Sequence, residues 1–138
     1  MATPHEGLAR LRAAARSGEL DIFCAERGIR VLTVFGSTAK ENTTPNDLDV
    51  AVLFEIDHSG DIVQLVNEIS DLTGVSEIDV MDLSRADPVA QEQALVKCIP
   101  LYEREIGAYA EARAAAICMR MDTDWLRKWD LKLMAEGV

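Results

Sequence analysis

The sequence predicts an α/β (α+β) fold, in which a small mixed sheet of three to four strands is flanked by helices and followed by a C-terminal helical tail. Short apolar runs rich in β-branched residues alternate with longer stretches whose apolar residues recur at helical spacing. The 138 residues suffice for one buried core, and no repeat or linker divides them. We therefore expect a single domain over 1–138, with N-terminal helices in 1–28, a central core in 29–102 and C-terminal helices in 103–138.

The N-terminal helices are expected to cover one side of the sheet. Apolar residues at helical spacing predict a helix over 5–16, and a second helix follows Gly18 and ends near Gly28. The first strand is predicted over Ile29–Phe35, because this run is apolar and rich in β-branched residues and a glycine ends it.

Polar residues separate the first strand from the second. One helical turn capped by its first serine is predicted over 37–41, and a loop over 42–46. The second strand is predicted over 47–54, where apolar and polar residues alternate. Because successive side chains of a strand point to opposite faces, Asp47 and Asp49 share a face, opposite the apolar residues between them.

A third carboxylate is expected next to this pair. An amphipathic helix over 59–73 leads to a third strand over 76–83. A strand–helix–strand connection of this length implies parallel neighbours and a right-handed crossover. Since neighbouring strands lie about 4.8 Å apart, Asp79 should lie beside Asp47 and Asp49 on the same sheet face.

The remaining elements complete the sheet and form the tail. A helix is predicted over 87–96 and an edge strand over 99–102, where Pro100 is tolerated. An alanine-rich helix follows from Glu103, and the polar residues 122–124 are expected to cap and restart it.

The three aspartates predict a metal site. Carboxylates that share one face repel one another unless a cation lies between them. Mg²⁺ prefers oxygen ligands and commonly combines one or two carboxylates with substrate phosphates. Asp47 and Asp49 are therefore candidate metal ligands, and Asp79 is a candidate third ligand or general base.

The turn after the first strand predicts a phosphate site. Gly36 allows the backbone to approach a phosphate closely, and the Ser37 hydroxyl and the amides near the start of a helical turn donate hydrogen bonds to it. Lys40 follows one turn later and can offset phosphate charge. Together with the aspartates, the turn predicts a metal-dependent site that handles nucleotides.

The bulk properties exclude other classes. A formal net charge of −10 argues against direct nucleic-acid binding, which usually needs a basic face. The three widely spaced cysteines, Cys24, Cys98 and Cys118, predict buried small side chains in a reducing compartment. No apolar run approaches the length that spans a bilayer, so we expect a cytoplasmic protein without a membrane segment.

The motif resembles that of a known family. Phe35-Gly36-Ser37, nine further residues and Asp47-Leu48-Asp49-Val50 match the signature of the DNA polymerase β-like nucleotidyltransferase superfamily, and Asp79 falls at its third carboxylate. The chain resembles the minimal nucleotidyltransferases over about 30–102. Its tail, with Trp125 and Trp129, is similar to that of the antitoxins paired with HEPN-domain toxins.

The resemblance implies a nucleotidyltransferase fold and a Mg²⁺-dependent reaction with two metal ions. The expected substrate is ATP, whose AMP is transferred to a hydroxyl while pyrophosphate is released. In the antitoxin members the acceptor is a tyrosine of the HEPN ribonuclease toxin, so a hetero-oligomer with a HEPN toxin is expected. Two departures concern phosphate binding: many members have Arg-Gly where this chain has Lys40-Glu41, and Ser where it has Asn46.

Two alternatives remain open from the sequence. One is a nucleotidyltransferase for a small molecule such as a cationic aminoglycoside, although the sequence contains no separate acceptor domain. The other is a non-catalytic antitoxin that neutralises its toxin by binding alone. Trp125 and Trp129 share a helical face and belong either to a partner interface or to the core.

Overall fold

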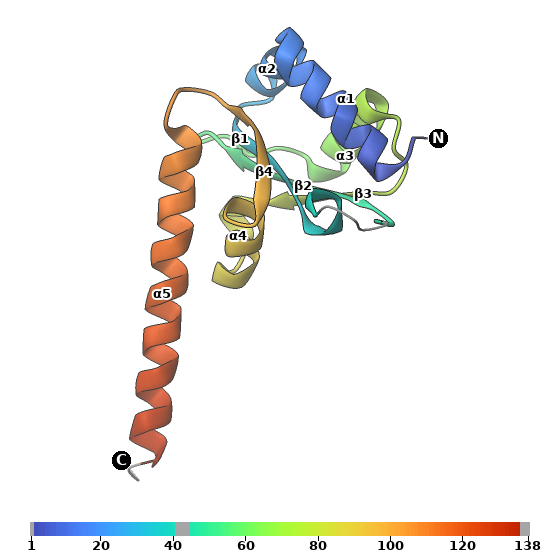
Figure 1. Cartoon of the computed structure of the whole chain (residues 1–138). Helices are drawn as coiled ribbons and strands as arrows, with labels where there is room; N and C mark the ends of the chain where they lie inside the picture. Colours follow the sequence, from blue (N-terminus) through green and yellow to red (C-terminus); the bar gives the residue numbers. More distant parts are fainter. Residues whose placement is uncertain (1, 41–44, 136–138) are drawn as a thin grey trace.

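A four-stranded mixed sheet with helices on both faces forms the protein (Figure 1). The structure is a computed structural model and describes residues 2–40 and 45–135. The strand order is β3-β2-β1-β4, and the predicted small mixed sheet is confirmed. The strands are β1 Ile29–Phe35, β2 Leu48–Phe54, β3 Ile78–Asp82 and β4 Cys98–Glu103.

The helices form two layers (Figure 1). Three cover one face of the sheet: α1 Pro4–Ser17, α2 Glu19–Glu26 and α3 Ile62–Thr73. Two cover the other face: α4 Pro88–Leu95 and α5 Ala108–Ala135. Two short 3-10 helices follow strands: η1 Gly36–Ala39 after β1, and η2 Leu83–Arg85 after β3. The predicted cover of N-terminal helices is confirmed.

The strand directions bring four strand ends to one edge of the sheet. β2 and β3 are parallel, as predicted from the helical crossover, whereas β1 is antiparallel to both β2 and β4. The last residue of β1 therefore lies at the same edge as the first residues of β2, β3 and β4. This edge carries η1 and the aspartates, and we call it the η1 edge.

The alternation of β2 separates the core from the polar site. Leu48, Val50 and Val52 are fully buried against the N-terminal helices. Ala51 faces the opposite core beneath α4 and α5. Asp49 is two residues before Ala51 on β2, and such residues point to the same face of a strand. Its carboxyl group therefore lies on the α4 side of the sheet.

The predicted turn after β1 differs in form. Instead of a turn over 37–41 capped by Ser37, the structure has the 3-10 helix η1, which begins at Gly36 and has Phe35 at its N-cap. The positive φ of Gly36 makes the chain turn one residue earlier than the serine pattern indicated. Most of the predicted loop over 42–46 lies outside the described residues.

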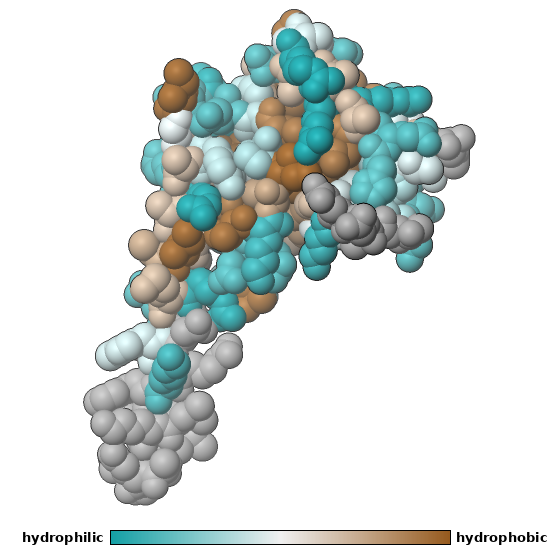
Figure 2. All heavy atoms as spheres, in the orientation of Figure 1, coloured by the Kyte–Doolittle hydropathy of each residue, from teal (hydrophilic) through white to brown (hydrophobic). Residues whose placement is uncertain are grey.

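The C-terminal helix differs from its prediction. Residues 122–124 do not restart a helix, because α5 continues without interruption to Ala135 and contains neither glycine nor proline to break it. Polar and apolar residues are interspersed along the part of α5 that Figure 2 colours. The far end of the helix extends beyond the sheet (Figure 1).

The prediction that all three cysteines are buried is wrong for two of them. Cys118 on α5 is exposed and Cys98 is half-buried, and only Cys24 is buried.

Within residues 2–40 and 45–135, no helix combines the length and the apolar character that crossing a bilayer requires.

Candidate active site

The three aspartates lie together at the η1 edge. Asp49 is the second residue of β2 and pairs in register with Asp79 on the parallel neighbour β3. Asp47 directly precedes β2, two residues before Asp49 and on the same face. Neighbouring strands are about 4.8 Å apart, so the carboxyl groups of Asp49 and Asp79 are close neighbours. The sequence predicted this arrangement from the alternation of side chains along β2 and from the helical crossover to β3.

The turn at Gly36 is built around Asp49. Phe35 pairs with Asp49 across β1 and β2, so the next residue of the chain turns directly over that carboxylate. Gly36 has a φ of +72°, and a Cβ at this position would collide with Oδ2 of Asp49. Only glycine meets both requirements without strain. The turn at Gly36 and the carboxylate of Asp49 thus form one local unit.

Thr38 joins η1 to the start of β2. Its side chain is buried, and its Oγ1 donates a 2.8 Å hydrogen bond to the carbonyl oxygen of Asp47. Sequence reasoning missed this residue. The sequence shows a threonine after the Gly-Ser pair, but the carbonyl that its hydroxyl contacts lies nine residues further along the chain. A local sequence pattern does not predict such a contact.

Negative charge is concentrated at the site. The pKa of Asp49 is raised to about 6, first by burial and then by the charges of Asp47 and Asp79. Asp47 is half-buried and Asp79 is exposed, so the site opens to solvent at β3. A cation at this edge would relieve the mutual repulsion of the three carboxylates.

The donor set fits a hard divalent cation. Among the described residues, no group of three His, Cys, Asp or Glu side chains is already arranged to hold a metal ion. Three carboxylates on adjacent strands nevertheless supply the oxygen ligands that Mg²⁺ prefers, and this ion commonly completes its shell with water and substrate phosphates. A metal would therefore be held jointly by these aspartates and a bound nucleotide.

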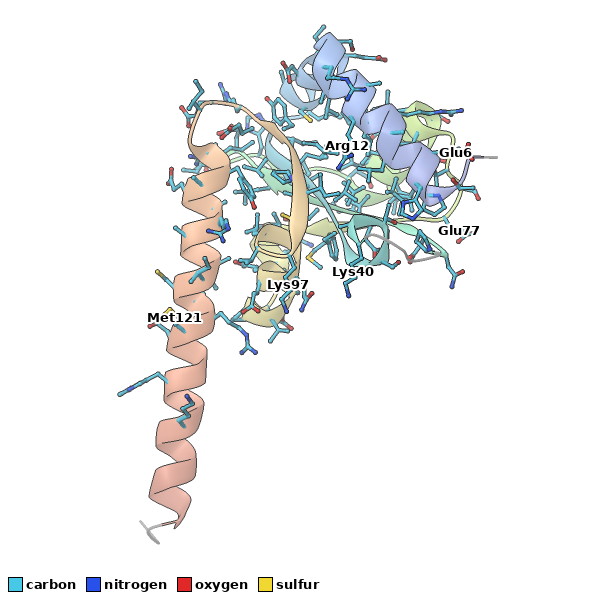
Figure 3. The ribbon with its side chains drawn as sticks, in the orientation of Figure 1. Glu6, Arg12, Lys40, Glu77, Lys97 and Met121 are labelled. Carbon is cyan, nitrogen blue, oxygen red and sulfur yellow. The ribbon has the colours of Figure 1, made fainter. Side chains whose placement is uncertain are left out.

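Lys40 lies at the end of η1. Its backbone N–H donates to the carbonyl of Ser37 at 3.2 Å, and its side chain is exposed. In Figure 3 the Lys40 side chain extends from η1 in the direction away from α1. Its place at the end of η1 is next to the Gly36 turn, and its contact with phosphate stays a prediction.

A cavity lies close to the turn but apart from the aspartates. Its volume is about 380 Å³ and none of the three aspartates lines it. Its walls come from α1, the η1 segment and β4, through His5, Leu8, Arg12, Thr38, Ala39, Lys40 and Ile99. The carboxylate site is instead an open edge of the sheet.

Comparison with protein families decides the class. Residues 20–106 match the family described as Polymerase beta, Nucleotidyltransferase. The chain belongs to this nucleotidyltransferase family. The matched span contains Gly36, Ser37, Lys40 and all three aspartates. No curated protein sequence matches the chain.

Solved structures of similar fold include toxin–antitoxin complexes. A chain of a toxin–antitoxin complex with AMP-PNP has a TM-score of 0.66 at 19% identity, covering 86% of this chain and 97% of that one. A complex of a tri-AMPylated Shewanella oneidensis HEPN toxin with its MNT antitoxin gives 0.62 at 19% identity, covering 88% and 98%. A protein assigned as a minimal nucleotidyltransferase gives 0.53 at 31% identity, covering 70% and 95%.

These comparisons confirm the enzyme class and fold predicted from the motif. The chain is a nucleotidyltransferase, and its fold is similar to that of chains in these toxin–antitoxin structures. The roles of the individual site residues remain predictions, as do the metal, the acceptor and the partner.

Proposed function

We propose that this nucleotidyltransferase is an antitoxin that transfers AMP from ATP to a tyrosine hydroxyl of a HEPN-type ribonuclease toxin in the cytoplasm. Residues 1–138 act in this proposal as one domain, with 29–102 as the catalytic core. The observation that carries it is the unit formed by Gly36, Asp49 and Asp79: a turn without a Cβ directly over one carboxylate, with a second carboxylate in register beside it.

The turn binds the phosphates of ATP. The hydroxyl of Ser37 and the amides at the start of η1 donate hydrogen bonds to phosphate oxygens, and Gly36 allows the approach. Lys40 supplies a positive charge at the end of the same short helix. The residues of this turn therefore hold the nucleotide with its phosphates over Asp49.

The aspartates hold the metal and handle the proton. Asp47, Asp49 and Asp79 would bind Mg²⁺, which stabilises charge on the attacking and leaving oxygens when bound, with two ions as the expected number. The acceptor oxygen forms a bond to the α-phosphorus, and the bond from that phosphorus to the bridging oxygen breaks, so pyrophosphate leaves. The exposed Asp79 is open to the incoming hydroxyl and takes its proton.

The acceptor is expected on another molecule. The described residues form a sheet with two helical layers, and the carboxylate edge has no lobe folded over it. The similar folds occur in complexes with HEPN toxins, one of them AMPylated. Trp125 on α5 is 62% exposed, which favours the partner interface over the core for this residue. The side chain of Trp129 lies outside the described residues.

The test combines acceptors and matched variants. The protein is incubated with Mg²⁺, ATP labelled in its α-phosphate, and either a HEPN-type protein or an aminoglycoside. We expect label on the HEPN protein and equimolar pyrophosphate. Asp47→Asn and Asp49→Asn should abolish transfer, whereas Asp71→Asn, an exposed aspartate on α3, should not.

Other outcomes would overturn the proposal in different ways. Label on the aminoglycoside alone would assign a small-molecule acceptor. Neutralisation of the toxin by Asp49→Asn without any transferred nucleotide would show that binding alone suffices.

A further inference from the structure

A lysine lies at the η1 edge on the strand opposite the aspartates. Phe35 at the end of β1 pairs with Asp49 on one side and with Cys98 of β4 on the other. Lys97 directly precedes Cys98, and Gly36 directly follows Phe35. Lys97 and Gly36 are thus the residues that adjoin the last pair of β1 and β4, which places both at the η1 edge. Asp49 flanks the Gly36 turn from the other side.

The backbone around Lys97 is anchored to three elements. The carbonyl of Ala94 accepts a 2.7 Å hydrogen bond from the buried Thr33 on β1. The carbonyl of Leu95 accepts one of 2.7 Å from the Tyr109 hydroxyl on α5. The N–H of Lys97 donates to the carbonyl of Glu92 at 3.3 Å. These contacts fix where the lysine side chain starts, relative to β1 and the turn.

The side chain itself is only weakly held. Its Nζ is 4.0 Å from Oε1 of Glu92, the outer limit of an ion pair, and the side chain is 59% exposed. Glu92 also contacts Arg120 at 3.2 Å, so it keeps a cationic neighbour if Lys97 moves. Exposed pairs of this kind contribute little to stability. Figure 3 shows Lys97 beside α4 and Lys40 beside η1.

A triphosphate at this edge needs more positive charge than the turn provides. The protein carries a formal net charge of −10, and three carboxylates face the same edge. A metal held by the aspartates offsets charge on their side of the turn. Phosphates bound on the far side of Gly36 would lie towards β4, the side from which the flexible Lys97 side chain starts.

We propose that Lys97 leaves Glu92 when nucleotide binds and contacts the β- and γ-phosphates, so that Lys40 and Lys97 flank the phosphate chain from the two ends of the turn. The inference rests on the proposed function, because it requires ATP at the Gly36 turn. Lys97 is then a substrate-binding residue, and its contact distinguishes a nucleoside triphosphate from a monophosphate.

Nucleotide affinities test this assignment. Titration calorimetry with Mg²⁺ measures the Kd of ATP and of AMP for the parent protein and for four variants, of which Glu92→Gln is the control for the ion pair. Lys97→Gln should weaken ATP binding about tenfold, the loss of one charge-assisted hydrogen bond, and leave AMP binding unchanged. Lys97→Arg should restore most of the ATP affinity. Arg85→Gln removes the same charge from an 83% exposed residue beyond the far end of β3 and should change neither Kd.

A structural role for Lys97 predicts a different pattern. If the lysine acts only through its pair with Glu92, then Glu92→Gln should weaken ATP binding as much as Lys97→Gln does, which would overturn the proposal. Equal losses for ATP and AMP, or an unchanged ATP Kd in Lys97→Gln, would also overturn it. A parent protein that binds no ATP would instead refute the proposed function itself, and the role of Lys97 with it.

Discussion

Replacing Gly36 by alanine separates the strain of the turn from its contact with Asp49. An alanine at a φ of +72° costs about 1–2 kcal/mol of folding free energy, because L-residues avoid the left-handed region. The new Cβ would meet the Asp49 carboxylate oxygen, which is the end of a rotatable side chain. We therefore expect the carboxylate to turn away, with little further loss of stability.

Gly18 provides the matched control. Its φ is +88°, and a Cβ there would have no atom within 4 Å. Gly18→Ala should thus carry the same conformational cost without touching the site. For a chain of this length, about 1–2 kcal/mol corresponds to a fall in Tm of about 3–10 °C in both variants.

The assay measures stability and transfer together. Thermal melts give the two Tm values, and pyrophosphate release at 20 °C gives the rate of nucleotidyl transfer. Displacing a reacting group by about 1 Å costs about 100-fold in rate, so Gly36→Ala should lose about 100-fold or more while Gly18→Ala stays near the parent. Equal rates in the two variants would refute the view that Gly36 is required by its approach to Asp49.

Four further predictions follow from the packing and the charges. Without Mg²⁺, Asp49→Asn should raise Tm at pH 8 but not at pH 4. The pKa of Asp49 is raised to about 6 in the folded protein, so ionisation of this carboxyl group destabilises the fold as the pH rises through that value. Equal gains in Tm at both pH values would contradict this. Thr33→Val should cost about 1–3 kcal/mol in urea unfolding, since the buried Ala94 carbonyl loses its donor; an unchanged midpoint would mean that water replaces it. Leu11→Ala, at a 1% exposed core position, should cost about 2–5 kcal/mol, and a smaller loss would indicate that α1 packs loosely. Trp125→Ala should weaken binding to a HEPN partner about tenfold or more in calorimetry, and an unchanged Kd would exclude this residue from the interface.

The sequence predicted the parts of the site that depend on strand alternation and on one crossover. The two-residue period of β2 placed Asp47 and Asp49 on one face, and the helix between β2 and β3 implied the parallel pairing that brings Asp79 into register with Asp49. Both inferences use rules that hold within a short stretch of chain. The edge position of β4 followed likewise from Pro100.

The parts that were missed depend on contacts between distant segments. Thr38 acts through a carbonyl nine residues away, and Lys97 reaches the η1 edge only because β4 is antiparallel to β1. Nothing in the composition of 96–103 specifies that pairing or its register. The uninterrupted α5 shows the converse: a polar triplet resembled a cap, but the helical hydrogen bonds continued in the absence of a breaking residue.

The intact mass of a HEPN partner tests the central claim most directly. The partner is incubated with ATP and Mg²⁺ in the presence of the parent protein, Asp49→Asn or Asp71→Asn, and its mass is recorded together with the modified residue. We predict that the parent and Asp71→Asn add one or more adenylyl groups to a tyrosine of the partner, and that Asp49→Asn adds none. An unmodified partner with the parent protein, or equal modification with Asp49→Asn, would contradict the assignment of the three-aspartate edge as the centre of AMP transfer.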